Sequence, residues 1–220
     1  MGGIISTTGM TEIILNAFLQ TLYMVFWSTL FSVIIGFIPA VILTLTAPDG
    51  LHPIRPVYEI LSFLINVFRS FPFVILLVLV IPFTRLMVGK AIGTTAAIVP
   101  LTISAIPFIA RIMETSLRET SPGVIEAARS FGASNIQILF RVYLKESIPR
   151  MLNGVILLII SLIGYSAMAG TVGGGGIGDI AIRYGYQQYR TDYLIVCSVI
   201  LIVFVQLIQM IGNHLYKRLS

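Results

Sequence analysis

Residues 21–45, TLYMVFWSTLFSVIIGFIPAVILTL, carry no charged side chain. About 20 apolar residues in an α-helix cross the hydrocarbon core of a bilayer, so this run is long enough to span a membrane. Only 10% of the whole chain is charged, against roughly 25% in soluble domains. The sequence therefore predicts an all-α integral membrane protein rather than a soluble domain.

Four further apolar stretches follow, so we predict five spans at about 21–45, 57–83, 94–110, 153–169 and 193–211. The second stretch is interrupted at Arg69 and Pro72, and the proline is expected to kink the helix there. Arg69 lies roughly 20 Å into this helix at 1.5 Å per residue. An ionisable group at that depth is a functional candidate, and an arginine that is paired or snorkels for structural reasons is the alternative.

The distribution of Lys and Arg predicts the orientation of the chain. Five spans place the two termini on opposite faces, and cytoplasmic loops are enriched in basic residues. With the N-terminus outside, Arg69 lies within the membrane and the outer face holds Arg85, Lys90, Arg183 and Arg190. The inner face then holds nine basic residues, namely Arg55, Arg111, Arg118, Arg129, Arg141, Lys145, Arg150, Lys217 and Arg218. We expect the C-terminus and the polar segment 111–150 to be cytoplasmic.

Within this cytoplasmic segment, residues 121–150 predict two short helices joined by a turn. Ser121 is a suitable N-cap with Pro122 at the first helical position, and Gly132 is suited to end that helix. Ser134, followed three residues later by Gln137, has the spacing of a capping box for the second helix.

The first of these short helices is a candidate docking surface. Ala127 and Ala128 add little bulk, so a partner could approach the backbone closely, and Glu126 places one charge beside them. A helix this short is not stable alone in water, so we expect it to dock onto a partner. A DNA-binding helix-turn-helix is disfavoured because membrane spans confine the segment on both sides.

A glycine-rich segment follows the fourth span and includes Gly173, Gly174, Gly175, Gly176 and Gly178. It has neither a preceding strand nor the Gly-Lys-Ser/Thr ending of a phosphate-binding loop. We expect a compact turn at the outer mouth of a translocation path, with a flexible link as the alternative. His52 and His214 are isolated, no metal site is expected, and no catalytic constellation is evident, so the chain is predicted not to be an enzyme.

Prolines inside the spans indicate helices that line a path, because a cavity or neighbouring groups can satisfy the carbonyls they leave free; plain kinks are the alternative. We take as candidate path or gate residues Arg69, Pro72, Pro100, Pro107, Tyr165 and Met168.

The stretch 126–145 resembles the EAA loop of ABC-importer permeases. Glu126, Ala127, Ala128 and Gly132 match the pattern at the proper spacing, and Leu144 also matches. Val142 stands in place of the usual isoleucine, and Lys145 replaces the usual proline. This departure leaves open where the second short helix ends. The resemblance implies that residues 122–132 form a coupling helix that sits in a cleft of a cytoplasmic ATPase.

The likeness extends over nearly the whole chain. The strings NVFRSFPFVILLVLVIPFTR, IVPLTISAIPFIAR and GYSAMAGTVGGGGIGDIAIRYGYQ resemble the permease subunits of methionine ABC importers. The resemblance implies a single permease domain over residues 1–220 with the type I ABC importer fold, in the bacterial cytoplasmic membrane. It also implies a homodimer with two ATPase subunits, which use ATP and Mg²⁺, and an extracytoplasmic, often lipid-anchored, methionine-binding protein.

The implied mechanism is ATP-driven alternating access, and no cofactor or nucleic acid is expected to bind this chain. The substrate class is methionine, with both enantiomers and some derivatives as candidates. One alternative is an ABC permease for another small amino acid such as cystine. The other is an ion-coupled secondary transporter, for which the only candidate intramembrane acid in the sequence is Glu59.

Overall fold

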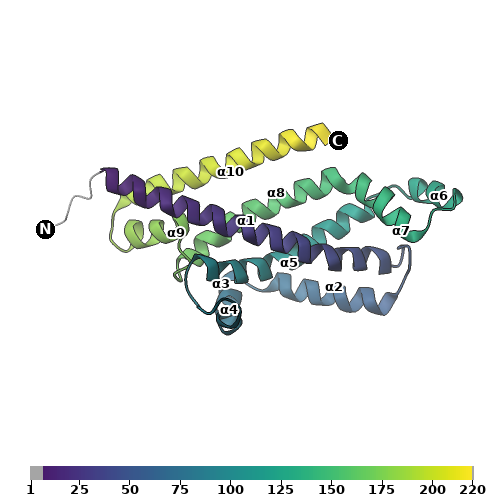
Figure 1. The fold of residues 1–220 in the computed structure, drawn as a ribbon, viewed down its shortest axis with the longest axis horizontal. Coiled ribbons are helices and arrows are strands. Elements are labelled where there is room, and N and C mark those ends of the chain that lie inside the picture. The colour runs from purple at the N-terminus through teal and green to yellow at the C-terminus, as the bar shows by residue number, and fades with distance from the viewer. Residues whose placement is uncertain (1–6, 220) are drawn as a thin grey trace. The chain divides into compact units, whose positions relative to one another are not determined.

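The computed structural model describes residues 7–219, and this part of the chain contains helices and no strand. In chain order (Figure 1) these are α1 Thr7–Thr46, α2 Arg55–Ser70, α3 Phe73–Leu79, α4 Ile81–Val88, α5 Thr94–Arg118, α6 Pro122–Ser130, α7 Asn135–Ile138, the π-helix η1 Leu139–Tyr143, α8 Leu144–Gly170, α9 Gly176–Ile180, the π-helix η2 Ala181–Tyr186 and α10 Thr191–Leu219. Four of the described helical segments are long and apolar enough to cross a membrane, or five if one bent pair counts as a single span.

Most of the long helices extend beyond the predicted spans. The first begins at Thr7 rather than near residue 21, and α5 continues to Arg118 rather than ending near residue 110. Residues 84–93, which lie between the second and third predicted spans, include the second half of α4. These differences share one physical reason: backbone hydrogen bonds within a helix do not end where an apolar side-chain run ends.

The second predicted span is broken rather than kinked. Helix α2 ends at Ser70, Phe71 is extended (φ −71°, ψ 125°), and Pro72 is the N-cap of α3. A residue before proline is pushed out of the helical region by the proline ring, which explains the extended Phe71. The sequence placed the interruption correctly, but the helix stops there instead of bending through it.

The chain divides into two compact units. Unit 1 comprises the chain as far as Leu30, Pro72–Ser104 and Ile159–Ile208. Its core brings together parts of α1, α9 and α10 through the buried residues Ile14, Ala17, Ile177, Ile180, Tyr193 and Cys197. Aromatic rings add to this core, since Tyr184 stacks on Tyr193 with 5.0 Å between ring centroids.

Unit 2 comprises Phe31–Phe71, Ala105–Leu158 and the chain from Gln209 on. One core cluster joins the turn after α1 to α5, α7 and η1 through Leu51, Leu117, Ile138, Leu139 and Tyr143. A second cluster joins α1, α2 and α5 through Leu43, Ile65 and Ala110. This unit carries the candidate docking helix α6.

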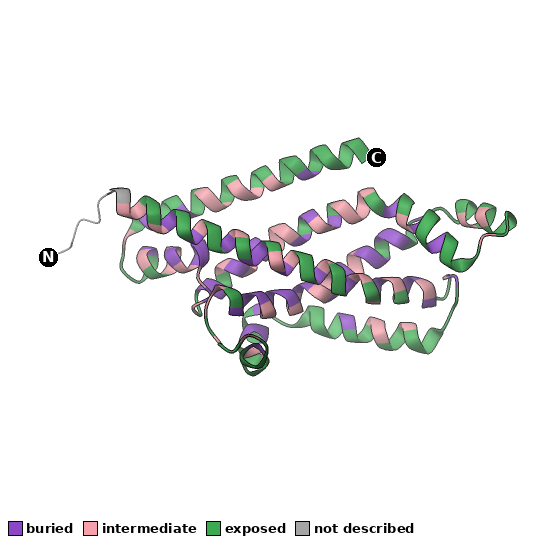
Figure 2. Cartoon of the chain, viewed as in Figure 1, coloured by how far each residue is buried: buried purple, intermediate pink, exposed green. Residues whose placement is uncertain are grey.

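Helix α10 shows how much apolar surface the chain leaves uncovered. Only 6% of its most apolar window is buried, and Figure 2 draws most of the helix as exposed or intermediate. Ile202 and Met210 are 61% and 62% exposed. A surface of this kind needs an apolar environment or a partner outside the chain.

Candidate functional site

Both ends of α6 are fixed by local backbone geometry. Ser121 is the N-cap and Pro122 occupies the first turn, although the Ser121 hydroxyl accepts no capping hydrogen bond. At the other end Gly132 has φ +79°, which favours glycine, and its N–H donates to the Arg129 carbonyl at 2.9 Å. The Ala133 N–H donates to the Ala128 carbonyl at 3.1 Å, which completes a Schellman motif. The predicted ends of this helix are confirmed.

The two faces of α6 have different surroundings. Ile125 and Ala128 pack against the core cluster of unit 2, whereas Glu126 and Ala127 are exposed. Phe131, directly after the helix, is 92% exposed. Ala128 is therefore partly buried, because the helical repeat turns it toward the core next to Ile125, and Ala127 is the more accessible of the two alanines.

The carboxylate of Glu126 makes no hydrogen bond or ion pair with any residue that the structure describes. An exposed charge without an intrachain partner and an exposed aromatic residue at the C-terminal end of the same helix are suited to recognition by another protein. The described contacts thus leave Glu126, Ala127 and Phe131 available to a partner.

The second short helix begins as predicted, and the structure shows where it ends, which the sequence left open. The Gln137 N–H donates to Ser134 Oγ at 3.3 Å, and the Ser134 N–H donates to Gln137 Oε1 at 2.9 Å, so the capping box is confirmed. From Asn135 the helical run continues through Lys145 and Pro149 to Gly170. Lys145 therefore does not end the helix, and neither does Pro149, which lies inside α8.

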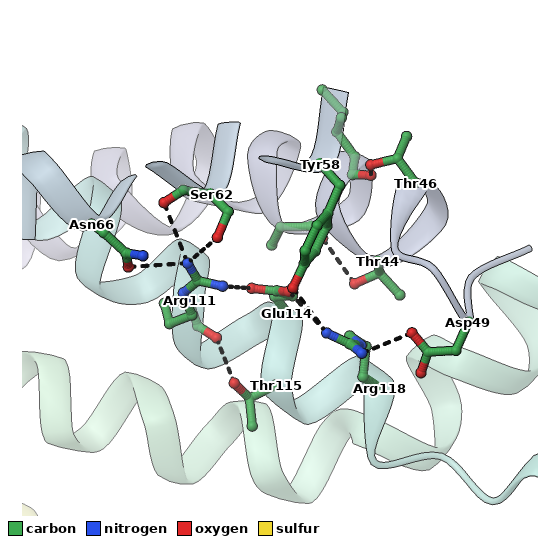
Figure 3. A network of polar contacts seen from close by, with 12 residues as sticks. Thr44, Thr46, Asp49, Tyr58, Ser62, Asn66, Arg111, Glu114, Thr115 and Arg118 are labelled. Atoms are coloured by element: carbon green, nitrogen blue, oxygen red, sulfur yellow. Dashed lines mark hydrogen bonds and ion pairs between the residues drawn. The ribbon is translucent and has the colours of Figure 1, made fainter. Parts of the chain in front are cut away.

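A network of polar contacts centred on Glu114 joins α5 to α2 and to the turn after α1 (Figure 3). Glu114 is only 2% exposed, and its two oxygens contact Arg111 Nη1 at 2.6 Å and Arg118 Nη1 at 3.4 Å. Arg118 also donates to Asp49 Oδ1 at 2.7 Å.

The sequence interpretation missed this network. The predicted end of the third span near residue 110 leaves Glu114 among the cytoplasmic residues, and Glu59 is then the only candidate intramembrane acid. In the structure Glu59 forms an exposed pair with Arg55, whereas Glu114 is buried. The spacing of Arg111, Glu114 and Arg118, three and four residues apart on one helical face, was the signal that could have revealed it.

The six candidate path residues do not form one cluster. Arg69 lies in the last turn of α2, is exposed, and makes no hydrogen bond or ion pair with a described residue. Pro72 is exposed at the break, and Pro107 is buried within α5 in unit 2. In unit 1, Tyr165 stacks on Phe73, the residue after Pro72, with ring centroids 4.7 Å apart, and Met168 is 46% exposed.

A mostly apolar cavity of about 110 Å³ lies in unit 1. Pro100 is the one candidate path residue that lines it, together with Leu77, Val78, Ile81, Thr84, Ala91, Ile92, Gly93, Ala96, Ala97, Ala169, Val172 and Gly174. The other five candidate path residues lie outside this cavity.

The glycine-rich segment forms a hydrogen-bonded turn followed by the helix α9 (Gly176–Ile180). Gly173 and Gly174 lie in the turn after α8, but Gly176 and Gly178 belong to α9, so the prediction of a loop across all five glycines is wrong for these two. Side chains of α1 fix the start of α9, since Gln20 Oε1 accepts from the Gly176 N–H at 2.8 Å and Thr21 Oγ1 accepts from the Ile177 N–H at 3.0 Å. These bonds disfavour a flexible link.

Comparisons with known proteins match almost the whole chain. Residues 32–220 match the family model of the binding-protein-dependent transport system inner membrane component. The chain is 48% identical over 210 residues to a probable D-methionine transport system permease protein MetI of Vibrio cholerae, covering 96% of this chain and 93% of that protein. It is 41% identical over 198 residues to the methionine import system permease protein MetP of Bacillus subtilis, covering 90% and 89%.

A solved structure is similar over the same extent. It is one of the inward-facing conformations of the MetNI methionine ABC transporter, and the matching chain superimposes with a TM-score of 0.95 at 42% sequence identity. The match covers 98% of this chain and all of that chain.

Proposed function

This chain belongs to the family of binding-protein-dependent transport system inner membrane components, and we propose from this premise that it is the permease subunit of a methionine ABC importer. It is a multi-pass protein of the cytoplasmic membrane. The substrate is inferred from the agreement among relatives: two proteins that match at least 90% of this chain, from Vibrio cholerae and Bacillus subtilis, are both described as methionine permeases.

The topology we propose has five spans, with the broken pair of α2 and α3 as one of them, an outer N-terminus and a cytoplasmic C-terminus. The nine-to-four distribution of basic residues supports this orientation. Both compact units then belong to one transmembrane domain. In this topology α6, α7 and the Glu114 network lie toward the cytoplasm, and the turn before α9 lies toward the outside.

The partners we propose are a second copy of the chain, two cytoplasmic ATPase subunits and an extracytoplasmic methionine-binding protein. ATP and Mg²⁺ bind the ATPase, and this chain contributes transport without catalysis of its own. The exposed side chains of Glu126, Ala127 and Phe131 support α6 as the helix that docks onto the ATPase. Closure of the ATPase dimer would move the two α6 helices together and open the path outward, and hydrolysis would reverse the change.

The test is uptake of labelled L-methionine into vesicles that contain the chain with its ATPase and binding protein. We expect uptake that requires ATP and is blocked by excess unlabelled methionine, but not by cystine or glutamine. Competition by D-methionine would measure enantiomer preference. Uptake of a different solute with ATP would refute methionine as the substrate, and uptake independent of ATP would refute an ABC importer.

We propose a role in the path or gate for Arg69, Pro72, Pro100, Pro107, Tyr165 and Met168, and Arg69 provides its test. Its exposed guanidinium lies two residues before the helix break and has no described intrachain partner. Arg69→Ala is expected to lower the maximal uptake rate about tenfold at unchanged abundance, because charged groups within membranes serve transport or pairing.

The control is Arg85→Ala, which removes an exposed arginine from α4, outside the membrane in the proposed topology. The measurement is the initial uptake rate normalised to permease in the membrane. If Arg69→Ala takes up substrate at the parental rate, Arg69 has a structural role and not a role in the path or gate.

A further inference from the structure

In the described part of the chain, Glu114 is the one acidic side chain that is buried. A buried carboxylate is costly unless it is paired. Arg111 and Arg118, one turn before and one turn after it on α5, supply the compensating charges. Asp49 balances the second arginine at 2.7 Å, so the four side chains together carry no net charge.

The arginines use their remaining donors to bind one face of α2. Arg111 Nη2 donates to Ser62 Oγ at 2.7 Å and to Asn66 Oδ1 at 3.1 Å, and Arg118 Nη1 donates to the Tyr58 hydroxyl at 3.2 Å. Tyr58, Ser62 and Asn66 are spaced by one helical turn and face the same side. The network therefore joins α5 to α2 along two successive turns (Figure 3).

The same network reaches α6. Arg118 is the last residue of α5, and α6 begins four residues later at Pro122. Arg118 and Asp49 line a cavity of about 210 Å³ together with Glu126 and Arg129 of α6. The packed cluster containing Leu117 of α5 also includes Ile125 and Ala128 of α6. A displacement of α6 would therefore act on the end of α5 where the network begins.

We propose that Glu114 is a positioning residue that couples α6 to α2, so that movement imposed on α6 by the ATPase is delivered to the helix that ends at the Phe71–Pro72 break. This inference rests on the proposed function. A purely apolar contact would hold the two helices together but allow them to slide, whereas directional hydrogen bonds fix their register. Loss of the Glu114 charge thus weakens transmission more than it weakens ATP hydrolysis.

The test is the amount of solute taken up per ATP hydrolysed by the complete importer in vesicles. Glu114→Gln keeps the shape of the side chain and removes its charge, and we expect uptake per ATP to fall about tenfold while ATP hydrolysis stays within about twofold of the parent. Glu114→Asp restores the charge on a shorter side chain and is expected to recover most of the ratio. The matched control is Glu59→Gln, which breaks the exposed Arg55–Glu59 pair on α2 and is expected to leave the ratio unchanged.

Asp49→Asn keeps the inference testable if Glu114→Gln does not fold, because Asp49 is 67% exposed and lies outside the helices. We expect it to lower uptake per ATP about threefold without loss of abundance. If both variants take up as much solute per ATP hydrolysed as the parent, the inference is overturned. A fall in uptake and in ATP hydrolysis by the same factor would also overturn it, because the ratio is then unchanged. The ratio can be measured with whichever solute the parent imports, so failure of methionine as the substrate is distinguished from failure of the Glu114 role.

Discussion

Gly178→Ala is expected to destabilise the permease and strongly reduce its abundance in the membrane. A Cβ added to Gly178 on α9 would overlap the backbone of Ala167 on α8, and one added to Gly170 would overlap the backbone at Gly178 and Asp179. Backbone atoms cannot rotate away as a side chain can, so the helices must separate. We expect a cost of roughly 3 kcal/mol, the upper range for overpacking, and a Tm lower by roughly 5–10 °C.

Gly164→Ala is the matched control, because Gly164 also lies on α8 and an added Cβ would meet no described atom within 4 Å. Alanine is favoured over glycine inside a helix by about 1 kcal/mol, so this variant should equal or exceed the parent in stability. Thermal unfolding of both variants in detergent gives the comparison. Equal Tm values for Gly178→Ala and the parent would show that α8 and α9 do not touch as described.

Glu126→Lys is expected to reduce uptake to less than about one-tenth of the parental rate at normal abundance, because juxtaposed like charges at an interface cost several kcal/mol. The carboxylate has no described hydrogen bond or ion pair inside the chain, but it lines a cavity with Arg118 and Arg129, so a lysine there also adds repulsion within unit 2. Normal abundance of the variant would show that the fold tolerates this repulsion, and the loss of uptake would then come from the ATPase side. Uptake and co-purification of the ATPase measure it, and Gly123→Ala on the same helix is the control, since its Cβ would meet only Ser121 Oγ, at 3.8 Å.

Substitutions at Gly132 distinguish the effect of an added negative charge from the effect of added side-chain bulk on docking through α6. A Cβ added at Gly132 would meet no described atom within 4 Å, so the only constraint on a substitution is the backbone φ of +79°. Asp and Asn both tolerate this conformation and have similar size. We expect Gly132→Asp to impair uptake more than Gly132→Asn; normal uptake by Glu126→Lys and Gly132→Asp, at normal abundance, would contradict docking through α6.

The features that the sequence predicted correctly depend on neighbouring residues. Pro72 interrupts its own helix, Gly132 ends α6, and Ser134 and Gln137 start α7, each through backbone atoms a few positions away. The all-helical membrane class followed from composition, because a chain with so few charges cannot cover a soluble surface.

The features that were missed depend on contacts between distant segments. Arg111 and Arg118 looked like cytoplasmic charges, but their partners Ser62 and Asp49 lie 49 and 69 positions away and draw them against α2 and the turn after α1. Gly178 looked like part of a loop, although its lack of a side chain serves a close contact with Ala167. Contacts of this kind depend on how distant helices pack together, and that packing cannot be read from the spacing of residues in a single sequence.

The single cysteine of the chain has a practical consequence. Cys197 is completely buried in the core of unit 1, next to Tyr193 and Ile177. Because thiol-directed reagents need an accessible thiolate, the native protein should remain almost unlabelled by water-soluble maleimides. A cysteine introduced at Ala127 would then be the only accessible thiol of this chain, and its protection from labelling during the ATP cycle would report when this surface is covered.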